Sequence, residues 1–387
     1  MAASLNPLRC GGTSMPVPLL LMAKLVALCL LLTNHVRLLT DPFLPFLSVF
    51  EGIPYFQISL KTVFVLSAVL LLFNRWVRVT SFLLGLTILL GVLSSRAYYG
   101  NNKTFTGLLL VFASVSDSGP RAWPIHIQMM VVYFGAGLNK LLDADWQSGQ
   151  FFEHWASAKL KNPVYMALSP LLPPLVAGKV MCWFTIVAEL AMPAMFALRP
   201  LVLFGMWLNI LFQSGLMIFT GTTFTMFFYA MTAAMLAFVP WPQSKVVVIW
   251  DGDCGFCAAS KAWVERFDLE RLLEWHPLQS GIGEKFGISM DALIARLHLV
   301  AEGRVYAGFR AFRYMAFTNP LTWLLIATLI SAVPENWSNW RRAVVIAALT
   351  FFSPLFAPIG ERLYNQVARN RHRLMPNSTC KIEPQQR

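Results

Sequence analysis

Two cysteines separated by two residues, Cys254 and Cys257, are the pair in this chain most able to do chemistry. They follow an apolar, β-branched run over 246–250 and precede a stretch with helical spacing over 258–267. A strand-to-helix turn of this kind places the first sulfur near a helix N-terminus, which favours its thiolate. The second thiol can then attack a mixed disulfide on the first and release it. The pattern predicts dithiol–disulfide exchange, with Cys254 as the nucleophile and Cys257 as the resolving thiol.

Two acidic residues, Asp251 and Asp253, lie beside this pair. Like charge near a thiol opposes its ionisation, but either carboxylate is also placed to move a proton for Cys257. The alternatives are a structural zinc site and two incidental cysteines. Zinc needs about four ligands, the sequence offers no second CxxC, and His276 and His298 each stand alone. We therefore expect no metal at this site. The expected reaction partner is either a protein that carries a thiol or disulfide, or a small thiol.

A second group of candidates lies in an apolar helix predicted over 123–142. Tyr133, Gly137 and Lys140 are spaced to share one helix face, and a charged residue at such depth is a functional candidate. The small residues at and before Gly137 let another helix or a flat ligand approach closely. Spacing alone leaves open whether Lys140 is functional or snorkels to the interface and pairs with Asp143. Further polar and aromatic candidates follow the helix directly: Asp143, Asp145 and Trp146.

The two halves that hold these groups differ in composition. Of 387 residues, 57% are apolar and 13% charged, against about 25% charged in soluble domains. The first 244 residues hold 21 charged residues and the remaining 143 hold 29. We predict a polytopic α-helical membrane domain over 1–240, an α/β thioredoxin-like domain over 245–374 and a polar tail over 375–387. The net charge of +12 agrees with contact to membrane lipids. Nucleic acid binding is not predicted, because the sequence has no basic stripe interleaved with aromatic residues.

The membrane half shows about eight apolar segments of roughly spanning length. They are 17–33, 57–73, 79–95, 104–116, 123–142, 178–198, 200–219 and 222–240. The short loop with Arg75 and Arg78 predicts a cytoplasmic side. An even number of spans then places the C-terminal domain in the cytoplasm and the 143–177 loop outside, so we expect a multi-pass membrane protein.

The C-terminal half contains an unusually apolar stretch over 320–357. It is predicted either as two helices buried on the sheet or as helices lying at the bilayer. In the second case four residues would sit at headgroup level: Trp337, Trp340, Arg341 and Arg342. The other cysteines are too scattered for a disulfide framework: Cys10, Cys29, Cys182 and Cys380.

The segment over 131–155, VVYFGAGLNKLLDADWQSGQFFEHW, resembles the signature of vitamin K-dependent gamma-carboxylase and its bacterial membrane relatives, the HTTM family. The resemblance implies that Lys140 is a base acting on a quinone or another lipophilic substrate at the outer face. A quinone is the one cofactor it leaves open. The segment over 100–110 resembles the Asn-His segment of that family, with Lys103 in place of the histidine. The resemblance therefore implies the fold more firmly than the reaction.

The segment over 251–257, DGDCGFC, closely resembles the DCC family of thiol-disulfide oxidoreductases. Segments over 274–280, 304–315 and 359–374 match the same family. The resemblance implies a membrane-bound thiol-disulfide oxidoreductase as the leading function. The alternatives are a carboxylase-like membrane enzyme with Lys140 as base and the CxxC as redox partner, and a non-enzymatic tether for the redox domain. Because members of both families usually occur in bacterial inner membranes, the two resemblances imply the same location for this protein.

Overall fold

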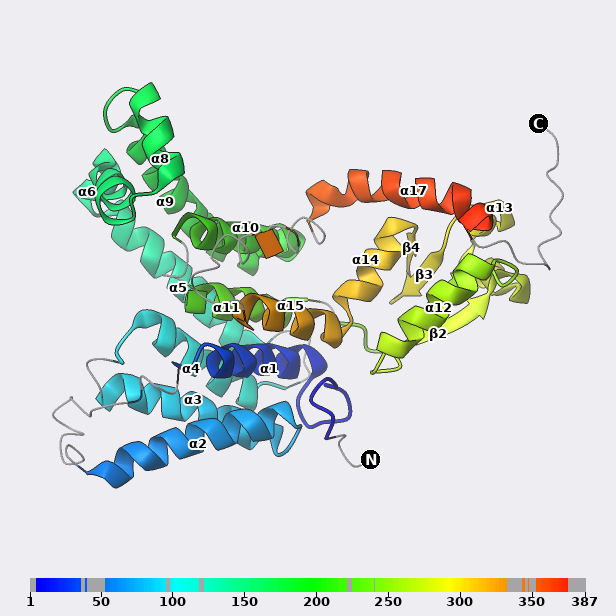
Figure 1. Cartoon of the computed structure of the whole chain (residues 1–387), viewed down its shortest axis with the longest axis horizontal. Coiled ribbons are helices and arrows are strands. Elements are labelled where there is room, and N and C mark those ends of the chain that lie inside the picture. The colour runs from blue at the N-terminus through cyan, green and yellow to red at the C-terminus, as the bar shows by residue number, and fades with distance from the viewer. Residues whose placement is uncertain are drawn as a thin grey trace. The chain divides into compact units, whose positions relative to one another are not determined.

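The computed structural model describes residues 5–35, 39, 53–94, 98–117, 122–220, 225–239, 241–332, 343–344, 347 and 353–374. The chain divides into two compact units. Unit 1 comprises Met1–Pro7, Gly12–Val239 and Ala327–Ile346. Unit 2 comprises Leu8–Gly11, Pro240–Ile326 and Ala347–Arg387. Figure 1 draws the helices of unit 1 from blue to green and the sheet of unit 2 in yellow.

Unit 1 is helical in its described part. Its main helices are α1 (Val17–Leu32), α2 (Pro54–Leu72), α3 (Val77–Ser94), α4 (Asn101–Val115), α5 (Trp123–Leu141), α9 (Val176–Ala197), α10 (Val202–Thr220) and α11 (Thr225–Ala234). Each overlaps one of the apolar segments expected from the sequence. The connection from α5 to α9 contains three short helices: α6 (Ala144–Ser148), α7 (Gln150–His154) and α8 (Pro163–Leu168).

Four helices in the described ranges are long and apolar enough to cross a membrane, namely α2, α3, α9 and α10. A fifth candidate arises if the bent pair of α14 (Phe309–Phe317) and α15 (Pro320–Ala332) counts as one span. Large apolar side chains point outward from these helices. Phe184 and Val187 on α9, for example, are 56% and 59% exposed, as a lipid-facing surface requires. The expectation of eight spans is not confirmed, whereas several apolar helices indicate a membrane protein.

Hydrogen bonds show which helix ends share one side of unit 1. The Arg78 guanidinium at the start of α3 donates to the carbonyl of Ser14, just before α1, at 3.0 Å. It also donates to the carbonyl of Ser114 at the end of α4, at 2.8 Å. Near the start of α5, the His126 ring is hydrogen-bonded to the carbonyl of Ala237, past the end of α11, at 3.0 Å. The helices therefore run up and down, and α11 ends on the side where α5 begins.

Unit 2 contains a four-stranded sheet with the order β2-β1-β3-β4. The strands are β1 (Val246–Trp250), β2 (Leu273–Pro277), β3 (His298–Ala301) and β4 (Arg304–Ala307). Strand β1 pairs in parallel with β2 and antiparallel with β3, and β4 is antiparallel to β3. The strand predicted over 246–250 is confirmed, and β3 was not predicted. A βαβ unit followed by a hairpin, with β3 opposite to the other strands, agrees with a thioredoxin-like domain.

Alternating side chains of β1 make two cores, as the period of a strand requires. Val246 and Val248 pack on one face with Met315 of α14 and Val264 of α12 (Gly255–Phe267). Ile249 packs on the other face in a cluster that includes Leu293 of α13 (Met290–Ala295). Helix α17 (Ala357–Leu374) contacts both α12 and α14. Figure 1 shows α12 and α14 beside the sheet.

The apolar stretch over 320–357 is described only in part. It begins as α15, whose residues from Ala327 onward group with unit 1. In that unit the Ser331 hydroxyl donates to the sulfur of Cys29 at 3.4 Å. Four residues were expected at headgroup level, and all lie outside the described residues: Trp337, Trp340, Arg341 and Arg342. Cys380 and the polar tail lie outside them as well.

Candidate active site

The turn between β1 and α12 builds the candidate site. Cys254 is the N-cap residue of α12. Its N–H donates to the carbonyl of Asp251 at 3.3 Å, and its sulfur accepts a hydrogen bond from the N–H of Cys257 at 3.4 Å. Both cysteines are free thiols. A helix N-terminus and a backbone donor on one sulfur stabilise the thiolate at Cys254, as the strand-to-helix pattern predicted.

The second thiol has the opposite character. Burial raises the pKa of Cys257 from an ordinary 9.0 to about 12, and the neighbouring Cys254 adds to the rise. The positive charge of Arg371 acts in the other direction. Cys257 therefore stays protonated near neutral pH.

The two sulfurs also differ in exposure. Cys254 is 1% exposed, whereas Cys257 is partly exposed. An incoming disulfide must approach the attacking sulfur along the axis of the bond that breaks. In this conformation the surroundings of Cys254 block that approach, so a local movement must precede any attack by it.

A buried carboxylate supports the turn. Asp251 is 6% exposed, and one carboxylate oxygen accepts the N–H of Asp253 at 3.2 Å. The other accepts from the Arg371 guanidinium at 3.1 Å, and Arg371 is itself 7% exposed. Asp253 is exposed and accepts from the Gln279 amide at 2.9 Å. The two acidic residues flagged in the sequence are therefore separated into one buried and one surface group.

Helix α17 contributes two side chains to this region, one seven residues after the other and so on one helix face. Besides its bond to Asp251, Arg371 donates to the carbonyl of Ile294 at 2.7 Å. The hydroxyl of Tyr364 accepts the N–H of Leu297 at 2.9 Å. Burial raises the pKa of Tyr364. Reasoning about the site from spacing missed Arg371, because it lies 120 residues from Asp251.

In unit 1, Lys140 forms an ion pair with a residue that sequence reasoning did not select. Its ammonium donates to both carboxylate oxygens of Glu189 on α9, at 2.7 and 3.0 Å. It also lies 5.1 Å from the ring centroid of Trp146. The expected pairing with Asp143 is wrong. That carboxylate instead accepts the N–H groups of Asp145 and Trp146 and caps α6.

Small residues allow α9 to come this close to α5. A Cβ atom added at Gly137 would lie 2.9 Å from the Leu190 side chain and 3.2 Å from Cβ of Glu189. The predicted close approach of a neighbouring helix is therefore confirmed at Gly137. Gly135 has no such neighbour, because a Cβ atom there would meet nothing within 4 Å.

Tyr133 lies one to two turns before Lys140 and joins a polar cluster between helices. Its hydroxyl donates to the side-chain oxygen of Asn209 on α10. The amide of Gln213 donates to the same hydroxyl at 2.8 Å, and that of Asn209 donates to the carbonyl of Met231 at 3.2 Å. Glu189 is near enough to act electrostatically on Tyr133. Tyr133 and Lys140 are therefore brought together, as their shared face predicted, while Asp145 is exposed on α6.

Lys103 begins a separate cluster near the start of α4. It is 8% exposed, and its ammonium donates to the carbonyl of Tyr98 at 2.7 Å while lying 4.1 Å from the Tyr98 ring centroid. Its charge also acts on His35. Among the described side chains, no hydrogen bond or ion pair joins Lys103 to Lys140.

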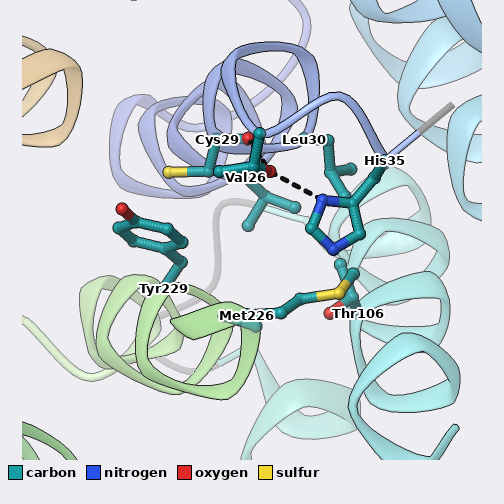
Figure 2. Close-up of a pocket in the computed structure, with 9 residues that line it drawn as sticks. Val26, Cys29, Leu30, His35, Thr106, Met226 and Tyr229 are labelled. Carbon is teal, nitrogen blue, oxygen red and sulfur yellow. Dashed lines mark hydrogen bonds between the residues drawn. The ribbon is translucent and has the colours of Figure 1, made fainter. Parts of the chain in front are cut away.

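A small pocket adjoins His35. Figure 2 shows the His35 ring pointing toward Thr106 of α4 and Met226 of α11, with Cys29 and Tyr229 on the other side of the pocket. The pocket has room for about one water molecule, which is far too little for a quinone ring.

The comparisons with known proteins agree with this division of chemistry. Residues 120–241 match the HTTM domain, and residues 248–340 match the DCC1-like thiol-disulfide oxidoreductase. No curated protein and no solved structure gives a significant match. In the described ranges, no group of three His, Cys, Asp or Glu side chains is placed to hold a metal ion. The chain therefore carries an HTTM domain followed by a DCC1-like thiol-disulfide oxidoreductase domain.

Proposed function

We propose that this chain is a membrane-anchored thiol-disulfide oxidoreductase whose redox centre is the dithiol of Cys254 and Cys257. The observation that carries the proposal is the N-cap geometry, in which the Cys254 sulfur accepts the N–H of Cys257 at 3.4 Å. One sulfur thereby lies at a helix N-terminus with a backbone donor, and the other thiol is kept protonated by burial. The match of residues 248–340 to the oxidoreductase family supports the same role.

The proposed reaction is a two-step exchange. The Cys254 thiolate attacks one sulfur of a substrate disulfide, forming a mixed disulfide and releasing the other substrate sulfur as a thiolate that takes a proton from water. Cys257 then gives its proton to a base, for which Asp251 is a buried carboxylate that acts on it electrostatically, and attacks the Cys254 sulfur. The second substrate sulfur leaves as a thiolate and takes up that proton. The substrate gains two electrons and two protons, and the protein is left with a Cys254–Cys257 disulfide that a second dithiol reduces.

The substrate class is a protein disulfide or a small disulfide. Because Cys254 is 1% exposed, the attack requires an opening that uncovers its sulfur. Exchange is therefore expected to be limited by this opening for bulky disulfides more than for small ones.

The test uses the full-length protein in nanodiscs and a fluorescent glutathione disulfide as substrate. Cys254→Ser is expected to lower exchange to the rate without protein, because no thiolate remains at the helix N-terminus. Cys257→Ser is expected to accumulate a mixed disulfide on Cys254, visible by intact mass. Cys182→Ser, a buried cysteine of unit 1, serves as the control and keeps full exchange. Full activity in the Cys254 variant would contradict the proposal.

A second candidate function belongs to the HTTM domain, and the polar cluster around Lys140 favours it. We propose that this cluster moves a proton to or from a lipophilic substrate. Lys140 is held by Glu189 at 2.7 Å, so the base role requires that this pair first separates or that Glu189 takes the proton. Lys140→Met and Glu189→Gln, compared with Lys103→Met, test the idea by complementation of a deletion strain. Normal growth with both Lys140→Met and Glu189→Gln would contradict it.

We also propose that the dithiol lies on the cytoplasmic side of a bacterial inner membrane. Arg75 lies between α2 and α3 and Arg78 in the first turn of α3, and an excess of basic residues at such short connections is typical of the cytoplasmic side. The hydrogen bonds of Arg78 and His126 support an even number of crossings before Val239. Cells carrying only Cys254 and Cys257 should react with an impermeant maleimide only after permeabilisation. Reaction in intact cells would invert this topology.

A further inference from the structure

We propose that Arg371 is a positioning residue of the redox site, which offsets the charge of Asp251 so that the Cys254 thiolate can form beside a buried carboxylate. This inference rests on the proposed function. It assigns a role to the C-terminal helix α17, far along the chain from the CxxC.

The contacts of Arg371 fix its guanidinium in place. One terminal nitrogen donates to the Asp251 carboxylate at 3.1 Å and to the carbonyl of Ile294 at 2.7 Å. Arg371 and Asp251 are 7% and 6% exposed, so water screens their charges little. The planar guanidinium suits such a fixed, multiply bonded position better than a lysine ammonium does.

The position of Asp251 explains why its charge matters for the thiols. It lies three residues before Cys254, and its carbonyl accepts the Cys254 N–H at 3.3 Å. An uncompensated buried carboxylate at this distance in sequence opposes a second negative charge at the dithiol. Pairing with Arg371 supplies the missing positive charge without a metal.

Among the described residues, the charged and titratable groups that act on Cys257, besides Cys254, come from two elements. The turn before α12 contributes Asp251, and α17 contributes Arg371 and Tyr364. At Cys257 the charges of Arg371 and Asp251 act with opposite sign. The proposal therefore predicts effects of opposite sign when either member of the pair is neutralised, which a purely structural role would not produce.

The experiment measures the pH dependence of Cys254 alkylation by iodoacetamide in reduced, full-length protein in detergent, with the modified peptide quantified by mass spectrometry. The quantity compared is the midpoint, the pH at which the alkylation rate of Cys254 is half its maximum. Arg371→Gln should raise this midpoint by about one pH unit or more, and Asp251→Asn should lower it. The double variant should return close to the wild-type midpoint. The midpoint reports ionisation, whereas the plateau rate reports access to the buried sulfur.

Two further variants make the test specific. Arg369→Gln removes the same charge from an exposed position of α17 and should leave the midpoint unchanged. Arg371→Lys keeps the charge and should recover part of the shift. If Arg371→Gln does not fold, the other two variants still test the proposal. Asp251→Asn should lower the midpoint, and Arg371→Lys should raise it slightly.

The outcomes separate this inference from the proposed function. Equal midpoints in wild type, Arg371→Gln and Asp251→Asn, or shifts of the two variants in the same direction, would overturn the role of Arg371. A wild-type protein that forms no Cys254–Cys257 disulfide with oxidised glutathione would instead remove the proposed function itself.

Discussion

Two buried carboxylates in this chain are each held by a cation, and the two pairs differ in what surrounds them. Asp251 pairs with Arg371 at 3.1 Å beside a pair of thiols. Glu189 pairs with Lys140 at 2.7 Å between two helices of the membrane-type bundle, near the hydroxyl of Tyr133. The first pair lies beside the dithiol for which we propose disulfide exchange. The second joins two helices, α5 and α9.

The largest expected effect breaks the pair in unit 1. Glu189→Ala leaves the Lys140 ammonium, whose side chain is 21% exposed, without its carboxylate, and breaking this partly buried pair should cost about 2 kcal/mol, less than a fully buried one. We expect a matching loss in the free energy of unfolding in detergent, measured by denaturant titration, with thiol-disulfide exchange per folded molecule unchanged.

The double variant Lys140→Met/Glu189→Leu sharpens this test. Replacing both members by apolar side chains of similar volume should restore most of the lost stability. Equal stability of wild type and Glu189→Ala would show that the pair is solvated and not a buried interaction.

One pH effect is expected at the thiols of unit 2. The pKa of Cys257 is about 12 in the folded protein and 9.0 ordinarily, so the unfolded chain loses this proton first. The stabilising contribution of the neutral thiol is complete below about pH 9 and is lost as the pH rises toward 12. Reduced protein should therefore become less stable to denaturant across this range. In Cys257→Ser the fall in the free energy of unfolding between pH 9 and 12 should be smaller by this contribution. An identical fall in wild type and Cys257→Ser would refute its attribution to Cys257.

The smallest expected effect concerns α17. Tyr364→Phe removes the hydroxyl that accepts the Leu297 N–H at 2.9 Å, and a hydrogen bond of this kind contributes about 1 kcal/mol. Denaturation monitored in unit 2 should show a loss of this size. Phe312→Leu, a change at a side chain that is 39% exposed, is the control. No loss in Tyr364→Phe would mean that the helix is held by the Arg371 pair alone.

What the sequence predicts well in this protein is local. The β-branched run over 246–250 and the helical spacing after it specify β1, the turn and α12, and so the N-cap position of Cys254. The apolar segments likewise predict the eight helices of unit 1, because each is defined by its own composition. Their number of membrane crossings is harder to predict, since α1 and α11 are shorter than a full span.

What the sequence does not predict is the partner of each charge. Lys140 has Asp143 three residues away, but Asp143 caps α6, and Glu189 arrives from another helix through the space left at Gly137. Arg371 reaches Asp251 only through the packing of α17. Such pairings depend on contacts between distant segments, which spacing rules do not describe.

The central claim is that the CGFC pair works as a reversible dithiol and disulfide. The most direct measurement equilibrates full-length protein in nanodiscs with glutathione buffers of increasing oxidation, stops exchange with acid and quantifies the Cys254–Cys257 disulfide by mass spectrometry. We predict a single transition in which each molecule releases two electrons as the disulfide forms, and which reverses on reduction. Thiols that stay reduced at every ratio, or that form only mixed disulfides with glutathione, would contradict the account.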